Sequence, residues 1–313
     1  MEHVIAALRR AAGDLPEGSW RVEAMPRAGE ALEMARIRLE GPSPRSWVAK
    51  RLHPRLLRER AAYAGPLAGA DVAPRMVAQA EAAGASLWIV LEDGGRALAP
   101  ADLEAAPEEA AALAARLHGI AWRPAPRPPW PRPVHVRHGR RHLAGEWRIA
   151  LGRAQAGVVG GVLEAELLPS TEEAAAVFER SWAAVCTRGT SFLHGDLQAA
   201  NLLRGEDGRL RAVDWSQWGY GPSLLDLASL GADLGERARE RFLDAYLDAR
   251  ALGGDLRPWR EALALALPYR LFIGLAVLAE YALRGEHGEA VRDRLPERAR
   301  AWRAAREEAS AWR

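Results

Sequence analysis

One segment, HGDLQAANLLRGEDGRLRAVDWS at residues 194–216, constrains the fold of this chain more than any other. Two short apolar runs flank RGEDG, which has the glycine and acidic residues of a turn, so the segment predicts a β-hairpin. Asp196 and Asn201 precede its first strand, and Asp214 follows its second. Because a hairpin returns the chain to the end where it started, these three side chains are expected to lie close together. They predict a Mg²⁺ site, since Mg²⁺ takes few carboxylates and completes its shell with water and phosphate oxygens.

Lys50 and Asn201 are the only lysine and the only asparagine in the chain, although Lys and Arg together occupy 43 positions. We interpret the abundance of Ala, Arg, Gly and Pro as G+C-rich coding pressure, which replaces Lys by Arg and Asn by other polar residues. Under this pressure, Lys and Asn are expected to remain only at positions where Arg or another polar residue cannot perform the same chemistry. A compact ammonium and a planar guanidinium differ in size and in hydrogen-bond geometry, and an amide oxygen binds a cation without adding a charge.

The spacing of the polar residues resembles the catalytic loop of protein-kinase-like phosphotransferases. His194 and Asp196 followed by Asn201 fit the pattern H-x-D-x-x-x-x-N. Gly195 in the middle, with NLL at the end, resembles the aminoglycoside phosphotransferase and choline kinase-like family. This resemblance implies that Asp196 is the catalytic residue and that Asn201 and Asp214 bind the metal. His194 is expected to hold the loop by hydrogen bonding rather than to act as a base.

The resemblance extends over about residues 20 to 230, with its motifs in the correct order. VAK places Lys50 where the family contacts the α- and β-phosphates, and Glu59 is implied as its ion-pair partner on a helix. Asp226 in LLDLASL matches the residue that steadies the catalytic loop. Gln198 stands where relatives often have His or Lys, so its contact with the γ-phosphate is left open.

The nucleotide is expected to be ATP, with GTP possible. The resemblance implies that the backbone from Glu92 to Gly94 receives the adenine. Gly29 in RAGEALEM either lets the backbone approach the phosphates or serves only as a turn, and the sequence leaves both open.

The fold class expected is α+β, a bilobal protein-kinase-like fold. The runs RVEAMP, ALEMARIRL and SWVAKRL alternate like strands, with RAGE as a turn between the first two. Pro54 suits the first turn of a helix, with Leu57 and Tyr63 on its apolar side. SLWIVLEDGG then predicts a strand followed by an acidic, glycine-rich turn. We therefore predict an N-lobe at 1–92, with an antiparallel sheet and a helix, and a larger, mainly helical C-lobe at 93–313.

Composition limits the partners and the compartment. Net charge is +2 and basic residues alternate with acidic ones, so no nucleic-acid partner is expected. Cys186 is the only cysteine and fits a reducing, cytoplasmic setting. The N-terminus predicts an amphipathic helix rather than a signal. Pro268 and Arg270 interrupt the most apolar run below the roughly 18 residues of a membrane span, so we expect a buried helix and no membrane.

These observations favour an ATP-dependent phosphotransferase that moves the γ-phosphate to a hydroxyl of a small molecule. Aminoglycosides, amino sugars, choline and similar compounds all stay open as acceptors, as do a monomer and a homodimer. One alternative is a metal-dependent hydrolase that uses His194, Asp196 and Asp214 as ligands. Another is a catalytically silent, kinase-like binding protein.

Overall fold

The structure is a computed structural model that describes residues 1–12, 18–25, 31–53, 57–82, 86–121, 136–253, 255–286 and 288–311. Gly29, Pro54 and the proline-rich segment 123–133 lie outside the described residues. Contacts between residues divide the chain into two units. The first comprises 1–99, 120–136 and 194–219, and the second comprises 100–119, 137–193 and 220–313.

The first unit is built on a five-stranded antiparallel sheet with the order β1-β2-β3-β5-β4. Its strands are β1 (Ser19–Met25), β2 (Glu33–Glu40), β3 (Arg45–Leu52), β4 (Met76–Glu81) and β5 (Leu87–Glu92). The predicted hairpin and third strand are confirmed, whereas β4, which has weak alternation and a bulge between Met76 and Ala78, was not anticipated. Because side chains alternate along a strand, Trp47 and Ala49 share one face of β3 and Lys50 projects from the other.

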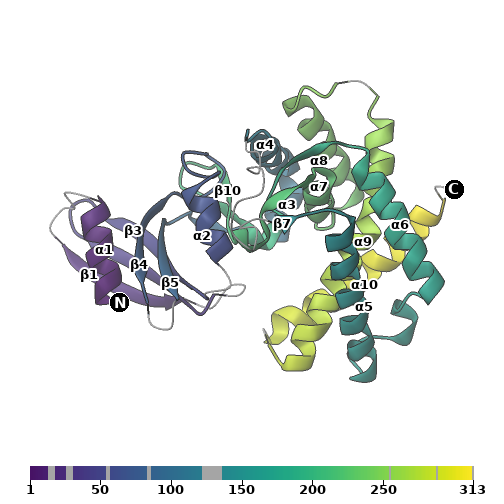
Figure 1. Cartoon of the computed structure of the whole chain (residues 1–313), viewed down its shortest axis with the longest axis horizontal. Coiled ribbons are helices and arrows are strands. Elements are labelled where there is room, and N and C mark those ends of the chain that lie inside the picture. The colour runs from purple at the N-terminus through teal and green to yellow at the C-terminus, as the bar shows by residue number, and fades with distance from the viewer. Residues whose placement is uncertain are drawn as a thin grey trace. The chain divides into compact units, whose positions relative to one another are not determined.

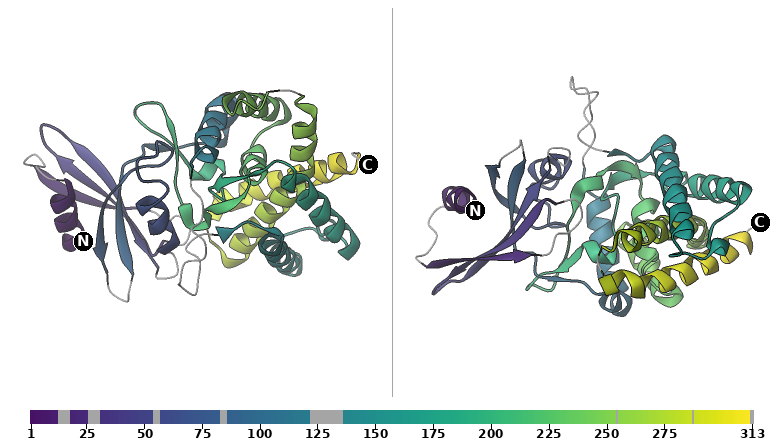
Figure 2. Two further views of the ribbon diagram at one scale, coloured as in Figure 1. Left: turned by 45° about the horizontal axis from the view of Figure 1, so that its top comes forward. Right: turned by 90° about the horizontal axis from the view of Figure 1, so that it is seen from below.

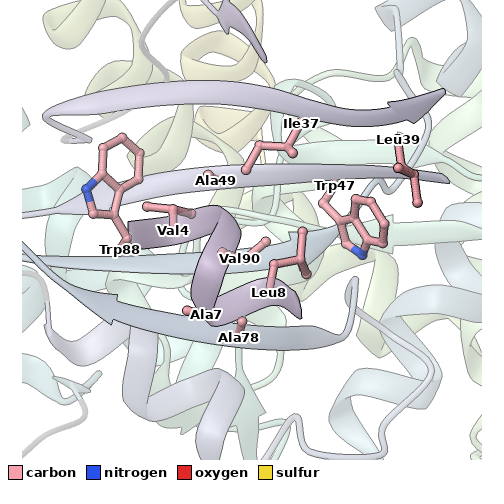
Figure 3. Close-up of a cluster of buried hydrophobic side chains, with 10 residues drawn as sticks. All are labelled: Val4, Ala7, Leu8, Ile37, Leu39, Trp47, Ala49, Ala78, Trp88 and Val90. Carbon is pink, nitrogen blue, oxygen red and sulfur yellow. The ribbon is translucent and has the colours of Figure 1, made fainter. Parts of the chain in front are cut away.

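Helix α1 (Glu2–Ala12) covers the apolar face of this sheet (Figure 1; Figure 2). Figure 3 shows the cluster that joins them, which consists of Val4, Ala7, Leu8, Ile37, Leu39, Trp47, Ala49, Ala78, Trp88 and Val90. Full burial of a side chain such as Leu8 stabilises the fold by about 1.5–3 kcal/mol. The predicted amphipathic helix is therefore confirmed, and the polar face of the sheet is left for α2 and the site.

The predicted helix is present as α2 (Leu57–Ala64), with Tyr63 buried as expected, but the rest of its buried face differs from the prediction. Leu57 is 42% exposed, and the buried residues are Glu59, Ala62 and Tyr63. The apolar pattern was misleading because this helix buries a charged residue, Glu59, which is 1% exposed.

The predicted hairpin at residues 202–212 is also confirmed. Strand β9 (Leu202–Arg204) pairs with β10 (Leu210–Ala212) on one side and with β6 (Arg96–Ala97) on the other, both antiparallel. Short 3₁₀ helices precede and follow the hairpin: η3 (Ala199–Asn201) and η4 (Trp215–Gln217).

The second unit is mainly helical, as predicted, and its centre is α9 (Arg257–Arg284), which packs against α5, α6, α7 and α10. The other helices are α3 (Pro100–Ala105), α4 (Pro107–His118), α5 (Arg140–Val159), η2 (Ala165–Leu167), α6 (Thr171–Cys186), α7 (Leu224–Gly231), α8 (Glu236–Ala249) and α10 (Gly288–Ala311). Strands β7 (Val136–Arg137), β8 (Thr190–Leu193) and β11 (Gly219–Pro222) form a small sheet.

Helix α9 continues through Pro268 and Arg270, so the prediction that they cut the apolar segment short is wrong. Within the described part of the chain, α9 alone is long and apolar enough to cross a membrane, and 67% of its apolar window is buried inside the protein. The predicted buried helix is therefore confirmed.

The proposed lobe boundary between residues 92 and 93 stays a prediction. The contact-based units differ from it, because residues 93–99, 120–136 and 194–219 group with the N-terminal sheet. Among the described residues, Asp226 is the one predicted site residue that belongs to the second unit.

Candidate active site

Three charged side chains meet on the polar face of the sheet. Lys50 Nζ lies 2.7 Å from Glu59 Oε2 and 3.3 Å from Asp214 Oδ1. Strand β3 supplies the lysine, α2 supplies the glutamate, and the turn after β10 supplies the aspartate. The ion pair implied for Glu59 is thus present, and Lys50 itself is only 4% exposed.

The electrostatics of this group follow from burial and opposite charge. Burial by itself lowers the pKa of Lys50, but the charges of Glu59 and Asp214 outweigh it, so the pKa of Lys50 is raised. Burial raises the pKa of Glu59, and the attraction of Lys50 opposes that rise. The lysine is therefore held as an ammonium, the form that attracts phosphate.

The catalytic-loop segment brings Asp196 and Asn201 together. Asn201 Nδ2 donates to the Asp196 carbonyl at 2.8 Å and to Asp196 Oδ2 at 3.1 Å. Gln198 Nε2 donates to the same carboxylate oxygen at 3.1 Å. Two amide groups therefore orient the half-buried Asp196 carboxylate, and the second of them, Gln198, was not assigned this role from the sequence.

His194 is fully buried, and both of its ring nitrogens are used. Nε2 donates to the Val213 carbonyl at 2.9 Å, and Nδ1 accepts from the Asp196 backbone N–H at 3.3 Å. The ring also lies against Trp215, with ring centroids 4.5 Å apart. These contacts fit the expected supporting role, and they leave no nitrogen to bind a metal.

The hairpin connects the two halves of the site. The Val213 N–H donates to the Asn201 carbonyl at 2.9 Å, so the residue before Asp214 is bonded to the proposed metal ligand that precedes β9. Asp214 has a left-handed backbone with φ 65°, an uncommon conformation for a residue with a side chain. Strand β10 and the loop before it also contact residues 71 and 72. Arg209 and Arg211 form ion pairs with Asp71, and the Ala212 N–H donates to the Val72 carbonyl at 2.7 Å.

Asn201 and Asp214 fit a hard divalent cation by the chemistry of their atoms. Both side-chain hydrogen bonds of Asn201 use its amide nitrogen, which leaves the amide oxygen as the atom for a cation. Asp214 adds one carboxylate, of which Oδ1 faces Lys50. The described residues contain no group of three or more His, Cys, Asp or Glu side chains placed to bind a metal. A pair of oxygen ligands suits Mg²⁺, which completes its shell with water and phosphate.

The turn after β5 is shaped by close packing. A Cβ at Gly94 would lie 2.6 Å from Leu203 Cδ1, and one at Gly95 would lie 2.1 Å from the Arg204 carbonyl oxygen. The backbone of β9 thus requires glycine at position 95, whereas at position 94 the neighbouring atoms belong to side chains. The Glu92 side chain pairs with Arg75 at 2.7 Å, and its backbone N–H donates to the Arg75 carbonyl. A role of Glu92 and Gly94 in binding adenine stays a prediction.

Asp93 in the same turn is an anchor that the sequence did not reveal. Its carboxylate accepts from Ser46 Oγ at 2.7 Å and from the Gly95 N–H at 3.2 Å, and it pairs with Arg36 Nε at 2.9 Å. The contacts with Arg36 and Ser46 come from β2 and β3, so only the folded register could show them.

In the second unit, Asp226 is fully buried on α7. Its Oδ2 lies 3.3 Å from His118 Nε2, and His118 Nδ1 lies 2.9 Å from the Tyr246 hydroxyl. The C-terminal end of α4, which has the sequence LAARLHG, is thus in contact with LLDLASL on α7. The predicted support of the catalytic loop by Asp226 stays a prediction.

The family model described as "Phosphotransferase enzyme family" matches residues 27–263. The chain belongs to this family. It is a small-molecule kinase, and kinases of this family generally use ATP and a divalent metal. The resemblance and the protein-kinase-like fold class predicted from the sequence are therefore confirmed. No curated protein matches the sequence significantly.

Solved structures of kinases share the fold of this phosphotransferase. The choline kinase from Cryptosporidium parvum has 14% identity and a TM-score of 0.70, over 99% of this chain and 96% of that one. Macrolide 2'-phosphotransferase MphH from Brachybacterium faecium has 21% identity and a TM-score of 0.51, over 96% and 97%. Amicoumacin kinase hAmiN, solved with AMP-PNP, Ca²⁺ and Ami, has 15% identity and a TM-score of 0.55, over 91% and 88%.

Proposed function

We propose that this phosphotransferase moves the γ-phosphate of ATP to a hydroxyl group of a small molecule, with Mg²⁺ as the divalent cation. An aminoglycoside, an amino sugar, choline or a similar compound is the proposed acceptor. The observation that carries the proposal is the connected arrangement on one hairpin. Asp196 contacts Asn201, Asn201 contacts the residue before Asp214, and Asp214 contacts Lys50.

Each side chain has a role that follows from its contacts. Asp196 orients the acceptor hydroxyl and accepts its proton, and Gln198 and Asn201 hold its carboxylate in place. Lys50 binds the phosphates as a buried ammonium that Glu59 keeps in position. When bound to Asn201 and Asp214, Mg²⁺ neutralises charge on the phosphate oxygens.

The nucleotide base is proposed to bind at the backbone of Glu92 to Gly94, with Gly29 near the phosphates. ATP is the expected donor because the family generally uses it, and the AMP-PNP in amicoumacin kinase supports an adenine nucleotide for this fold. Measuring turnover with ATP and GTP side by side tests the choice of base.

The alternative of a metal-dependent hydrolase is disfavoured by His194. A three-ligand site of His194, Asp196 and Asp214 needs a free imidazole nitrogen, and both nitrogens are engaged by the backbone. The proposed reaction fits a cytoplasmic location and a small molecule as the partner.

Replacing Asp196 by Asn tests the catalytic assignment. Turnover with a panel of hydroxylated acceptors is expected to fall by about 10²-fold or more, because a positioned proton acceptor contributes that much. Nucleotide affinity should change little. Asp207→Asn, on the exposed loop of the same hairpin, serves as the matched control and should keep full turnover. Full turnover in Asp196→Asn would refute the role.

A further inference from the structure

Helix α2 carries Glu59 but has little of its own to fix its position. It is 8 residues long, and helices shorter than about 12–15 residues are marginal in isolation. Its buried face contains one charged residue, one alanine and one tyrosine. The orientation of Glu59 must therefore come from contacts that other elements make with α2.

The segment that follows Asp214 supplies such contacts. Trp218 is 2% exposed, and its indole Nε1–H donates to the Arg58 carbonyl of α2 at 2.7 Å. The backbone of Trp215 also forms a hydrogen bond to the Glu59 carboxylate, and η4 packs directly against α2. The loop after Asp214, the proposed metal ligand, thus forms hydrogen bonds with two successive residues of α2, Arg58 and Glu59.

A second side-chain contact of α2 comes from Arg60, whose Nε donates to Gln79 Oε1 on β4 at 2.7 Å. That bond is exposed to solvent, where competition with water reduces its net effect. The bond from Trp218 is shielded by the buried indole, so it constrains α2 more strongly.

We propose that Trp218 is a positioning residue, whose indole N–H ties the Asp214 loop to α2 and so keeps Glu59 against Lys50. The metal-binding loop and the Lys50–Glu59 pair then keep their relative position as one body. The nucleotide part of the test below rests on the proposed function, while the helix-ordering part does not.

Hydrogen exchange in the nucleotide-free protein tests the tie directly. Trp218→Phe keeps most of the aromatic bulk and removes the donor, so amides of residues 57–64 should exchange about fivefold faster. Trp302→Phe is the matched control, because Trp302 is fully buried in the second unit and donates to the Leu167 carbonyl at 3.1 Å. It should leave the exchange of α2 unchanged.

Nucleotide affinity tests whether Trp218 acts through Glu59. With AMP-PNP and Mg²⁺ as the probe, Trp218→Phe should weaken binding about fivefold. The single variant Glu59→Gln should also bind AMP-PNP more weakly than the wild-type protein. The double variant should bind no more weakly than Glu59→Gln alone, because the tie matters only when Glu59 is present.

The outcomes separate this inference from the proposed function. Unchanged α2 exchange in Trp218→Phe overturns the inference, and so does a uniform acceleration that includes α9, since that is general destabilisation. Additive losses of affinity in the double variant overturn it as well. If the wild-type protein binds no nucleotide, the proposed function fails, and α2 exchange alone still decides whether Trp218 orders the helix.

Discussion

The Lys50 ammonium lies between two carboxylates in a space that admits little water. Asn201 uses its amide nitrogen to bind Asp196, and its amide oxygen is the atom proposed to bind the cation. An aspartate at 201 would lose both donors and would set a second carboxylate against the first. The single lysine and the single asparagine thus stand where arginine and aspartate make poor substitutes.

Replacing Lys50 by Arg is expected to lower turnover about tenfold or more, although the charge is kept. The guanidinium is larger and planar, and overpacking a buried site costs roughly 1–3 kcal/mol. Steady-state kinetics with saturating acceptor measure the effect. Arg51→Lys is the matched control on the same strand, because Arg51 is partly exposed and pairs with Glu33. If Lys50→Arg is as active as this control, the account of the lone lysine is wrong.

At the scale of elements, the sequence predicts the strands, turns and helices whose pattern lies in a few neighbouring residues. The alternation of β2 and β3, the turn RGEDG and the amphipathic α1 all appear as expected. Strand β4 is missed because its apolar residues do not alternate, and the face of α2 is misread because it buries Glu59. Contacts such as Asp93 with Arg36, or Trp218 with Arg58, join residues far apart in sequence, and no local pattern encodes them.

Gly95→Ala and Gly69→Ala separate backbone strain from packing. Both glycines have left-handed φ, 95° and 80°, so alanine strains each by about 1–2 kcal/mol. At Gly95 the new Cβ would also meet the Arg204 carbonyl oxygen, whereas nothing lies within 4 Å at Gly69. We expect Gly95→Ala to lose roughly 2 kcal/mol more stability than Gly69→Ala in chemical denaturation. Equal losses would show that β9 does not constrain the turn.

The β9–β10 hairpin should also show a distinct pH response at its loop. Arg211 donates to both carboxylate oxygens of Asp207, at 3.0 and 2.7 Å, and this lowers the pKa of Asp207 from 3.8 to about 2. Because the folded-state pKa is the lower one, the carboxylate stabilises the fold above pH 3.8, and this contribution is lost as pH falls through about 2.

An NMR titration of the Asp207 carboxyl group checks this response. The midpoint should lie near 2 in the wild-type protein and should rise towards 3.8 in Arg211→Gln. Arg204→Gln is the control in the same hairpin, because Arg204 donates to the Gly208 carbonyl. An unchanged midpoint in Arg211→Gln would mean that Arg211 does not set the pKa.

At the scale of the whole molecule, the chain separates into a unit that holds the proposed nucleotide and metal groups and a unit that is mainly helical. The sequence motifs predict strands β1, β2, β3 and β5, helix α2 and the β9–β10 hairpin of the first unit, because each lies in a short stretch with its own pattern. They do not predict β4 or the grouping of residues 194–219 with the N-terminal sheet. In the second unit, the apolar residues of the helices predict which helix faces are buried. They do not predict which acceptor the helices bind. The family and the reaction class are therefore readable from the sequence, and the acceptor is not.

This division leads to a prediction about where a nucleotide stabilises the protein. A ligand that binds only the folded state at 100 times its Kd stabilises that state by about 2.7 kcal/mol. With Mg²⁺ and AMP-PNP at 100 times its Kd, we expect slower hydrogen exchange in β3, α2 and the β9–β10 hairpin. Amides there that exchange only when the first unit opens should slow about 100-fold. Amides of α10 belong to the other unit and should slow far less, as long as the two units open separately. Equal protection of α10 would mean that the units open together, and unprotected amides in β3 and α2 would contradict the proposed nucleotide site itself.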